Sequence, residues 1–175
     1  MNDENEILIS LFELGLALFI GIGTVFLTQY IFTKIYKKQT GDEFPHRNLA
    51  FMIFLSSSVF GVAWLVFGIT EPLNGTLKLL MASETSGGRI VMEYIKFLGL
   101  FLFFGYFLGL AINYLSFLIF SGLTKNVNEF EEIQEGNIGV ALIISAVIVV
   151  ISLFCREPFI YFLESFMPYP ELPGF

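Results

Sequence analysis

Four carboxamide side chains are the groups in this chain whose type and spacing suggest chemistry inside a membrane. Gln29 and Asn113 each lie about 15 residues into a long apolar segment, where an amide needs a hydrogen-bond partner because hydrocarbon supplies none. Asn48 and Asn137 stand at the beginnings of two other apolar segments. Amides at such depths either join helices by hydrogen bonds or line a polar path. The hydroxyl residues that would share such a path are Thr24, Thr28, Ser56, Ser116 and Ser145.

Each amide pair has a structural and a functional interpretation. The first turn of a helix has free backbone N–H groups, so Asn48 and Asn137 are expected to accept one of them as helix caps. Alternatively, these two amides face each other and line a polar entrance. Gln29 and Asn113 predict hydrogen bonds between helices, and alternatively a polar path that passes water or weakly held ions.

Charged residues are scarce and lie near the ends of the apolar segments. Glu13 and Lys96 predict interfacial anchoring or an ion pair with each other, and alternatively a functional intramembrane charge. The acidic residues between Glu129 and Glu135 predict a solvated helix face. A divalent cation would need converging oxygens, and no ligand loop with a turn glycine is present here.

The sequence gives no support to enzymatic activity, a metal or a cofactor. It contains no phosphate-binding loop, nucleophile elbow, zinc helix motif or dinucleotide fingerprint. Cys155 is the single cysteine and predicts a small apolar residue rather than a disulfide or a metal ligand. The net charge of −7 argues against nucleic acid as a partner, because phosphate binding needs clustered Lys and Arg.

The composition is that of a membrane protein. Of the 175 residues, 55% are hydrophobic and only 14% are charged, and the mean hydropathy is +0.76. Soluble domains carry about a quarter charged residues. Uncharged runs close to or above the roughly 18 residues that cross a bilayer occupy Leu14–Thr33, Leu49–Thr70, Phe97–Thr124 and Ile138–Cys155. The predicted fold class is an all-α integral membrane protein with four transmembrane helices, since barrel strands would be shorter and alternating.

These runs divide the chain into parts. Residues 1–72 form a first helix pair with spans at about 7–36 and 47–70, and residues 90–157 form a second pair with spans at about 91–124 and 137–155. Residues 73–89 connect the pairs, and their apolar residues at helical spacing predict an amphipathic helix on the membrane surface. Residues 158–175 predict an aromatic interfacial tail.

Basic residues orient the helix pairs. Lys and Arg are concentrated in the connection between the first two spans, and the segment before the first span contains none. Positive residues near helix ends are retained on the cytoplasmic side. Both termini and the connection at 73–89 are therefore predicted to lie outside the cytoplasm.

The two helix pairs read as copies of one unit. Residues 14–21 are LGLALFIG and residues 98–105 are LGLFLFFG. The matching polar positions are Gln29 with Asn113, Asn48 with Asn137, and Ser56 with Ser145. Each unit crosses the membrane twice, so the second unit enters from the same side as the first. The sequence predicts two parallel helix-pair repeats about a pseudo-twofold axis along the membrane normal.

Glycines in the spans predict close helix packing. Gly21 and Gly105 fall at matched depths, Gly105 and Gly109 are four residues apart, and Gly61 lies four residues after Ser57. Small residues let helix backbones approach where lipid supplies no hydrophobic drive between helices. These faces pack within one bundle or against another subunit. A homo-oligomer or a membrane-protein partner is therefore expected, beside the lipid bilayer itself.

The chain resembles the YjfL-like bacterial inner-membrane proteins, a family described as a domain of unknown function. The resemblance lies in the duplicated order of a long helix, a short connection and a second helix opening with RNLAF from Arg47 or EGNIGVALI from Glu135. It covers about Leu14 to Phe154 and implies a four-helix protein of the bacterial inner membrane with no assigned reaction. The long middle connection and the aromatic tail depart from shorter members.

Two functions follow from these patterns. The first is an oligomeric or partner-binding membrane scaffold subunit, favoured because the helices contain no cluster of charges. The alternative is a small ion or solute channel or transporter, with its polar path along the pseudo-twofold or an oligomer axis. A duplicated unit favours this alternative because symmetry suits a pore.

Overall fold

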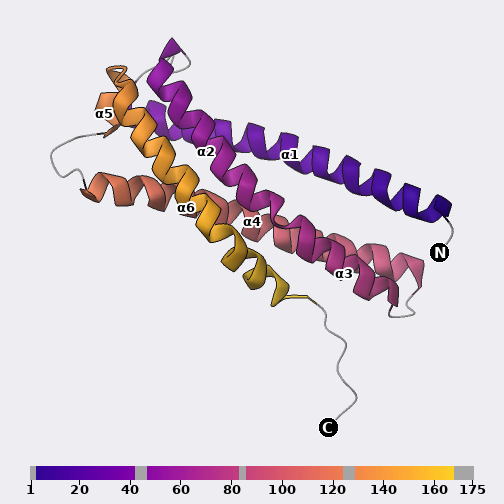
Figure 1. The fold of residues 1–175 in the computed structure, drawn as a ribbon. Coiled ribbons are helices and arrows are strands. Elements are labelled where there is room, and N and C mark those ends of the chain that lie inside the picture. Colours follow the sequence, from indigo (N-terminus) through magenta and orange to yellow (C-terminus); the bar gives the residue numbers. More distant parts are fainter. Residues whose placement is uncertain (1–2, 42–46, 83–85, 124–128, 168–175) are drawn as a thin grey trace, which may run out of the picture.

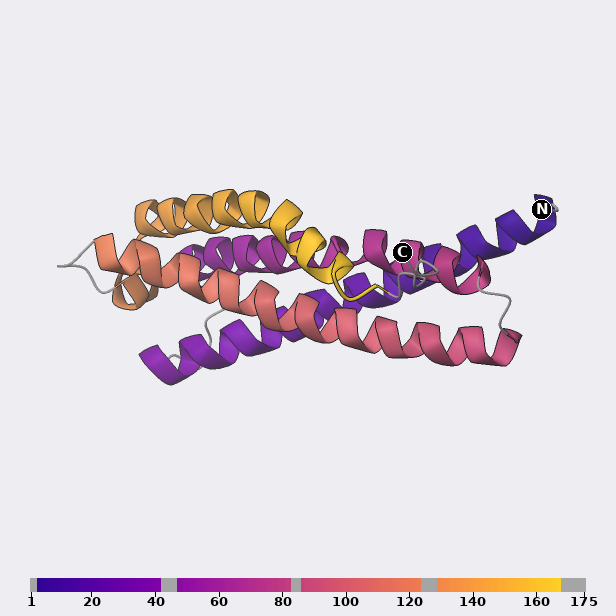
Figure 2. The same ribbon diagram turned by 90° about the horizontal axis from the view of Figure 1, so that it is seen from below.

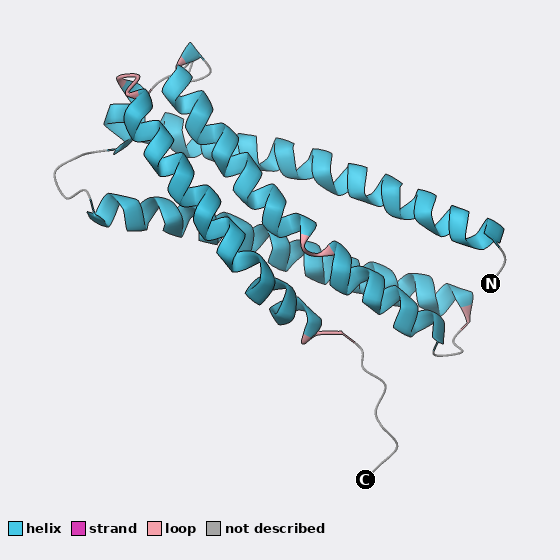
Figure 3. Ribbon diagram, in the orientation of Figure 1, coloured by secondary structure: helices cyan, strands magenta, loops and turns pink. Residues whose placement is uncertain are grey.

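The computed structural model describes residues 3–41, 47–82, 86–123 and 129–167, which contain six helices and no strand (Figures 1 and 3). The helices are α1 (Asp3–Thr40), α2 (Leu49–Phe67), α3 (Thr70–Ala82), α4 (Gly87–Leu123), α5 (Glu129–Gln134) and α6 (Ile138–Glu164). Four stretches are long and apolar enough to cross a bilayer: Ser10–Thr40, Leu49–Ala82, Gly87–Gly122 and Ile138–Glu164. The predicted all-α class with four spanning helices is confirmed, and the chain is a multi-pass membrane protein.

Helix α2 lies at the centre of the bundle. It packs against α1, α4 and α6, and the contact with α6 is the most extensive. Successive spanning helices run in alternating directions, so the beginning of α1 and the end of α6 point toward the same end of the bundle (Figure 2). α1 packs mainly against α2 and touches α5, whereas α4 packs against α2, α3 and α6. The two helix pairs therefore have unequal surroundings, and the internal duplication stays a prediction.

The connection after α2 differs from the predicted surface helix at 73–89. α3 begins already at Thr70, after a short break in which the Gly68 N–H donates to the Leu65 carbonyl over 2.9 Å. It then continues beside α4 (Figure 1). The segment is helical over Thr70–Ala82, but Leu73 is buried in a cluster with Tyr94 and Phe101 of α4. A neighbouring helix, and not the membrane surface alone, covers the apolar side of α3.

Helix α6 continues past the predicted end of its span at residue 155. It reaches Glu164 with Pro158 in its interior, and it bends in this region (Figure 2). The proline ring clashes with the carbonyl four residues earlier and removes one helical hydrogen bond, which accounts for a bend in place of a stop. Phe159 and Leu163 are buried, so the first part of the predicted aromatic tail is a packed helix. Residues 168–175 of that tail lie outside the described residues.

The core has two apolar clusters. One lies at the α5 end of the bundle and is rich in phenylalanine: the rings of Phe54 and Phe117 are 6.0 Å apart, and those of Phe117 and Phe130 are 4.5 Å apart. The other lies toward α3, and its members include Val62, Val66 and Phe101. Between these two clusters, the spanning helices carry buried polar side chains.

Candidate functional site

The interface between α2 and α4 depends on the predicted glycines Gly105 and Gly109. A Cβ at Gly105 would lie 3.2 Å from Cγ2 of Ile69, and a Cβ at Gly109 would lie 3.4 Å from Cγ1 of Val62. Both glycines are buried. They let α4 approach α2 closely, which is the packing role that small residues have in membrane helices.

One helical turn further along α4, Asn113 forms part of a buried polar layer. Its side-chain N–H donates to the Ser58 carbonyl of α2 over 3.4 Å, and the residue is fully buried. Gly61 of α2 makes room for this amide, because a Cβ there would lie 2.6 Å from Asn113 Nδ2 and 2.6 Å from Ser152 Oγ of α6. The amide of Asn113 and the hydroxyl of Ser152 therefore both lie against Gly61. Asn113 thus joins α4 to α2 through a backbone carbonyl.

Each of the four spanning helices contributes a side chain to this layer. The antiparallel register that sets Phe32 of α1 against Phe54 of α2 puts Thr28 level with Ser58. Thr28, Ser58, Asn113 and Ser152 are all fully buried. In each of them one oxygen has no hydrogen-bond partner among the described residues: Thr28 Oγ1, Ser58 Oγ, Asn113 Oδ1 and Ser152 Oγ. Buried polar atoms without partners are uncommon in folded proteins, which makes this layer a candidate site.

The polar layer lies between the two apolar clusters. Toward α5, the rings of Phe32, Phe54 and Phe117 follow one turn further along the helices. Toward α3, Val62 and Val66 are fully packed. Buried polar side chains also lie outside this layer, at Thr24, Ser116 and Ser145, and the polar path predicted from the amides and serines stays a prediction.

Sequence reasoning missed Ser58, Ser152 and the contact of Tyr106 with Thr24. Tyr106 of α4 shares a hydrogen bond of 2.9 Å with Thr24 Oγ1, whose hydroxyl also donates to the Ile20 carbonyl. Ser152 lies two helical turns after Ser145, on the same face of α6, and this spacing would have identified it. Ser58 is the last of three successive serines, and no sequence signal separates it from its neighbours.

Asn48 and Asn137 are both helix caps. Asn48 Oδ1 accepts the Phe51 N–H over 3.2 Å at the start of α2, and Asn137 Oδ1 accepts the Val140 N–H over 3.2 Å at the start of α6. Both amides lie beside α5, and a hydrogen bond occupies the side-chain N–H of each. Asn48 donates to the carbonyls of Ile133 (2.6 Å) and Gln134 (2.9 Å), and Asn137 donates to the Glu132 carboxylate (2.6 Å).

The acidic segment is only partly a solvated face. Glu129 is 2% exposed and accepts a hydrogen bond of 2.8 Å from the Ser121 hydroxyl at the end of α4. Glu131 and Glu135 are exposed as predicted. Gly136 has φ +84°, a conformation that glycine adopts without strain, and it turns the chain from α5 into α6. α5 thereby closes one end of the bundle.

The predicted serine and charge pairs are not symmetric in the structure. Ser145 of α6 donates to the Ile53 carbonyl of α2 over 3.4 Å, whereas Ser56 is exposed and bonds to Met52 of its own helix. Lys96 pairs with Glu93 at 2.6 Å and not with Glu13. Glu93 is one turn away on the same helix, so this pair needs no approach between helices.

The counterparts of Gly105 and Asn113 in the first pair are uncovered. Gly21 is exposed, and a Cβ there would meet nothing within 4 Å. Gln29 is exposed, so it does not line the interior of the bundle, and it has no hydrogen bond to any described residue. The physical reason is the difference in neighbours: α4 packs along α2, α3 and α6, whereas α1 packs mainly along α2 and meets α4 through side chains such as Tyr106.

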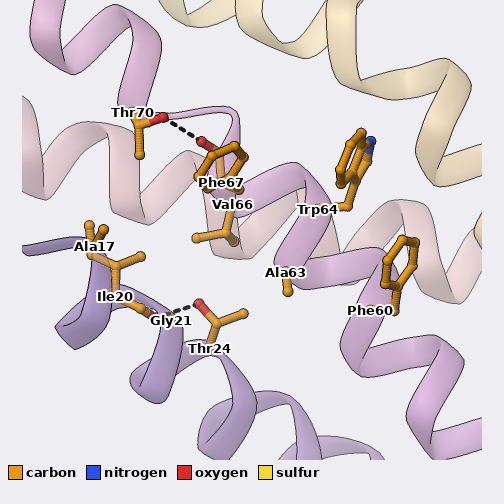
Figure 4. Close-up of a pocket in the computed structure, with 10 residues that line it drawn as sticks. All are labelled: Ala17, Ile20, Gly21, Thr24, Phe60, Ala63, Trp64, Val66, Phe67 and Thr70. Atoms are coloured by element: carbon orange, nitrogen blue, oxygen red, sulfur yellow. Dashed lines mark hydrogen bonds between the residues drawn. The ribbon is translucent and has the colours of Figure 1, made fainter. Parts of the chain in front are cut away.

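A crevice runs along this uncovered side of α1. It has a volume of about 290 Å³ and lies between α1 and the α2–α3 junction (Figure 4). Ala17, Gly21 and Ala63 are its small residues, and Phe60 and Trp64 lie along its α2 side. A second hollow shares Ala17 and Gly21 with it and continues over Leu14, Leu18, Ile22 and Val25. We call these residues of α1, together with Gln29, the open face of α1.

The family model for the Domain of Unknown Function (DUF350) matches residues 6–157. The chain belongs to this family. The match covers the first three spanning helices and most of the fourth in this DUF350 protein, and it confirms the resemblance drawn from its sequence. No curated protein and no solved structure among those compared matches the chain. Among the described residues of the DUF350 protein, no group of three His, Cys, Asp or Glu side chains is arranged to hold a metal ion.

Proposed function

We propose that this DUF350 protein is a non-enzymatic membrane scaffold subunit that binds further transmembrane helices along the open face of α1. One observation carries the proposal: Gly21 and Gln29 are uncovered, whereas their sequence counterparts Gly105 and Asn113 are buried against α2. The first half of the chain has a glycine and an amide at the positions that pack helices in the second half, but there these residues have no neighbouring helix. A helix from another subunit would supply that neighbour.

The two apolar clusters of the core also support a scaffold over a conduit. Apolar clusters lie on both sides of the polar layer, so association, and not passage, accounts for the small residues on the helix surfaces. Without a hydrophobic drive between helices in lipid, tight association depends on such small residues and on polar contacts.

Replacing Gly21 by Leu should lower the associated fraction of the protein in native membranes. The leucine fills the space that a neighbouring helix backbone would occupy. Gly99→Leu is the matched control, because Gly99 of α4 is also exposed and a Cβ there meets nothing within 4 Å. Chemical cross-linking in membranes, followed by denaturing electrophoresis, measures both variants. The proposal fails when the unmodified protein is only monomeric.

A channel is the second candidate, and the polar layer favours it. All four spanning helices supply unpartnered oxygens at one level, which would suit water or a weakly held ion. Liposome reconstitution with a flux assay tests this function. Flux above that of empty liposomes, altered by Asn113→Leu, would place the channel ahead of the scaffold.

We also infer an inner-membrane protein with both termini outside the cytoplasm, from the distribution of Lys and Arg. In a Cys155→Ser background, a cysteine replacing exposed Ser86 should react with an impermeant maleimide in intact spheroplasts. A cysteine replacing exposed Glu135 should react only after permeabilisation. The reverse labelling pattern would invert the topology.

A further inference from the structure

We propose that the helix covering the open face of α1 is α1 of a second copy of this chain, related by a twofold axis along the membrane normal. This inference rests on the proposed function and names its partner. Three features support it: the chemistry of Gln29, the position of the crevice level with exposed apolar side chains, and the absence of charge beside the crevice.

Gln29 is the residue that selects a second copy. Its amide is exposed near the end of the uncharged run Leu14–Thr33 and bonds to no described residue, so it needs both an acceptor and a donor. A second Gln29 across a twofold axis supplies both, since amides are self-complementary. An unrelated apolar helix would leave the amide without a partner in hydrocarbon. Lipid acyl chains would leave it equally without one.

A twofold axis along the membrane normal keeps every residue at its own depth. Leu18 and Ile22 are each 58% exposed and stand level with the crevice beside Gly21. In the dimer, these side chains enter the crevice of the partner and the partner's copies enter this one. Such a reciprocal, self-complementary contact is the usual form of a twofold interface.

The open face carries no charge over the depth of the crevice, and Lys34 and Lys37 border the separate hollow that Gln29 lines. No charged residue occurs from Leu14 to Thr33, and the nearest charges are Glu13 and Lys34. Small residues at Ala17 and Gly21 permit close approach of the two backbones over that depth. Gln29 lies two to three turns further along and fixes the register of the pair.

Cysteine cross-linking in native membranes tests the geometry. In a Cys155→Ser background, Val25→Cys places a thiol on the open face, between Gly21 and Gln29, and leaves the amide intact. Oxidation should convert it to a disulfide-linked dimer. Phe107→Cys is the control, because Phe107 is 58% exposed on α4 and reports random collisions.

The amide is tested separately by Gln29→Leu and Gln29→Asn. Interhelical hydrogen bonds of this kind predict that Gln29→Leu raises the dissociation constant about threefold to twentyfold, measured by energy transfer between labelled copies in liposomes. Gln29→Asn keeps the amide and should retain most of the affinity. An equal loss for both variants would remove the amide from the interface.

The outcomes separate this inference from the proposed function. Dimer formation by Val25→Cys but not by Phe107→Cys supports the second copy. A larger complex in native membranes without a Val25→Cys dimer overturns the second copy and leaves the scaffold function standing. Monomer alone in native membranes overturns both.

Discussion

Gly61→Ala should lower the free energy of unfolding by about 1–3 kcal/mol, the usual cost of overpacking a core. The new Cβ would lie 2.6 Å from Asn113 Nδ2 and from Ser152 Oγ, and 3.2 Å from Ile148 Cγ2. Moving the amide breaks its bond to the Ser58 carbonyl, and moving the hydroxyl forces it into a packed core. Alanine favours the helix over glycine by about 1 kcal/mol. This gain offsets part of the steric cost, so the steric cost itself is larger than the net loss of stability that is measured.

Thermal unfolding of the purified protein in detergent or bicelles measures the change. Gly21→Ala is the matched control, because a Cβ at Gly21 meets nothing within 4 Å. Its stability should equal or exceed that of the unmodified protein. Adding Ser152→Ala to Gly61→Ala removes one of the two atoms that would lie 2.6 Å from the new Cβ and should restore part of the loss. If Gly61→Ala and Gly21→Ala have the same midpoint, Gly61 does not hold the layer together.

The spanning helices and their caps are predictable because their causes are local. A bilayer requires apolar runs of a set length, and the uncharged residues 14–33 and 138–155 predict two of the spanning helices. An Asn at the head of such a run meets free N–H groups in any fold, so Asn48 and Asn137 become caps. The glycine spacing of Gly105 and Gly109 likewise predicts a packed face.

Burial depends on contacts between helices, and sequence patterns do not predict it. Gln29 and Asn113 occupy matching positions, yet one is exposed and the other is fully buried, because α4 packs along α2, α3 and α6 whereas α1 packs mainly along α2. Glu129 was expected in solvent and is buried by its contact with Ser121, a residue eight positions earlier on another helix. Such contacts depend on how the elements meet, which the spacing of residues along the chain does not encode.

This difference between the halves links the fold to the proposed function. The second half of the chain has Gly105 and Asn113 inside the bundle, while the first half has Gly21 and Gln29 on the surface. Surface amides in hydrocarbon are costly unless they are paired. An assembly that covers α1 therefore completes the packing already present around α4.

Asn48→Ala should lower the free energy of unfolding by about 2–4 kcal/mol, more than the roughly 1 kcal/mol expected for Asn137→Ala. Both changes remove a helix cap. Asn48 in addition donates to the carbonyls of Ile133 and Gln134, and the Ile133 side chain is fully buried. Its loss therefore releases α5 from α2, whereas Asn137 loses only a contact with the Glu132 carboxylate.

Hydrogen exchange distinguishes these two losses in the same samples. Amides of α5 should exchange faster in Asn48→Ala than in Asn137→Ala, because only the first variant frees that helix. Asn48→Asp keeps the oxygen that caps α2 but cannot donate to the two carbonyls, so its stability should lie between those of the unmodified protein and Asn48→Ala. Equal stability of Asn48→Asp and the unmodified protein would mean that the cap alone accounts for Asn48, and that α5 is held by Phe130 and Ile133.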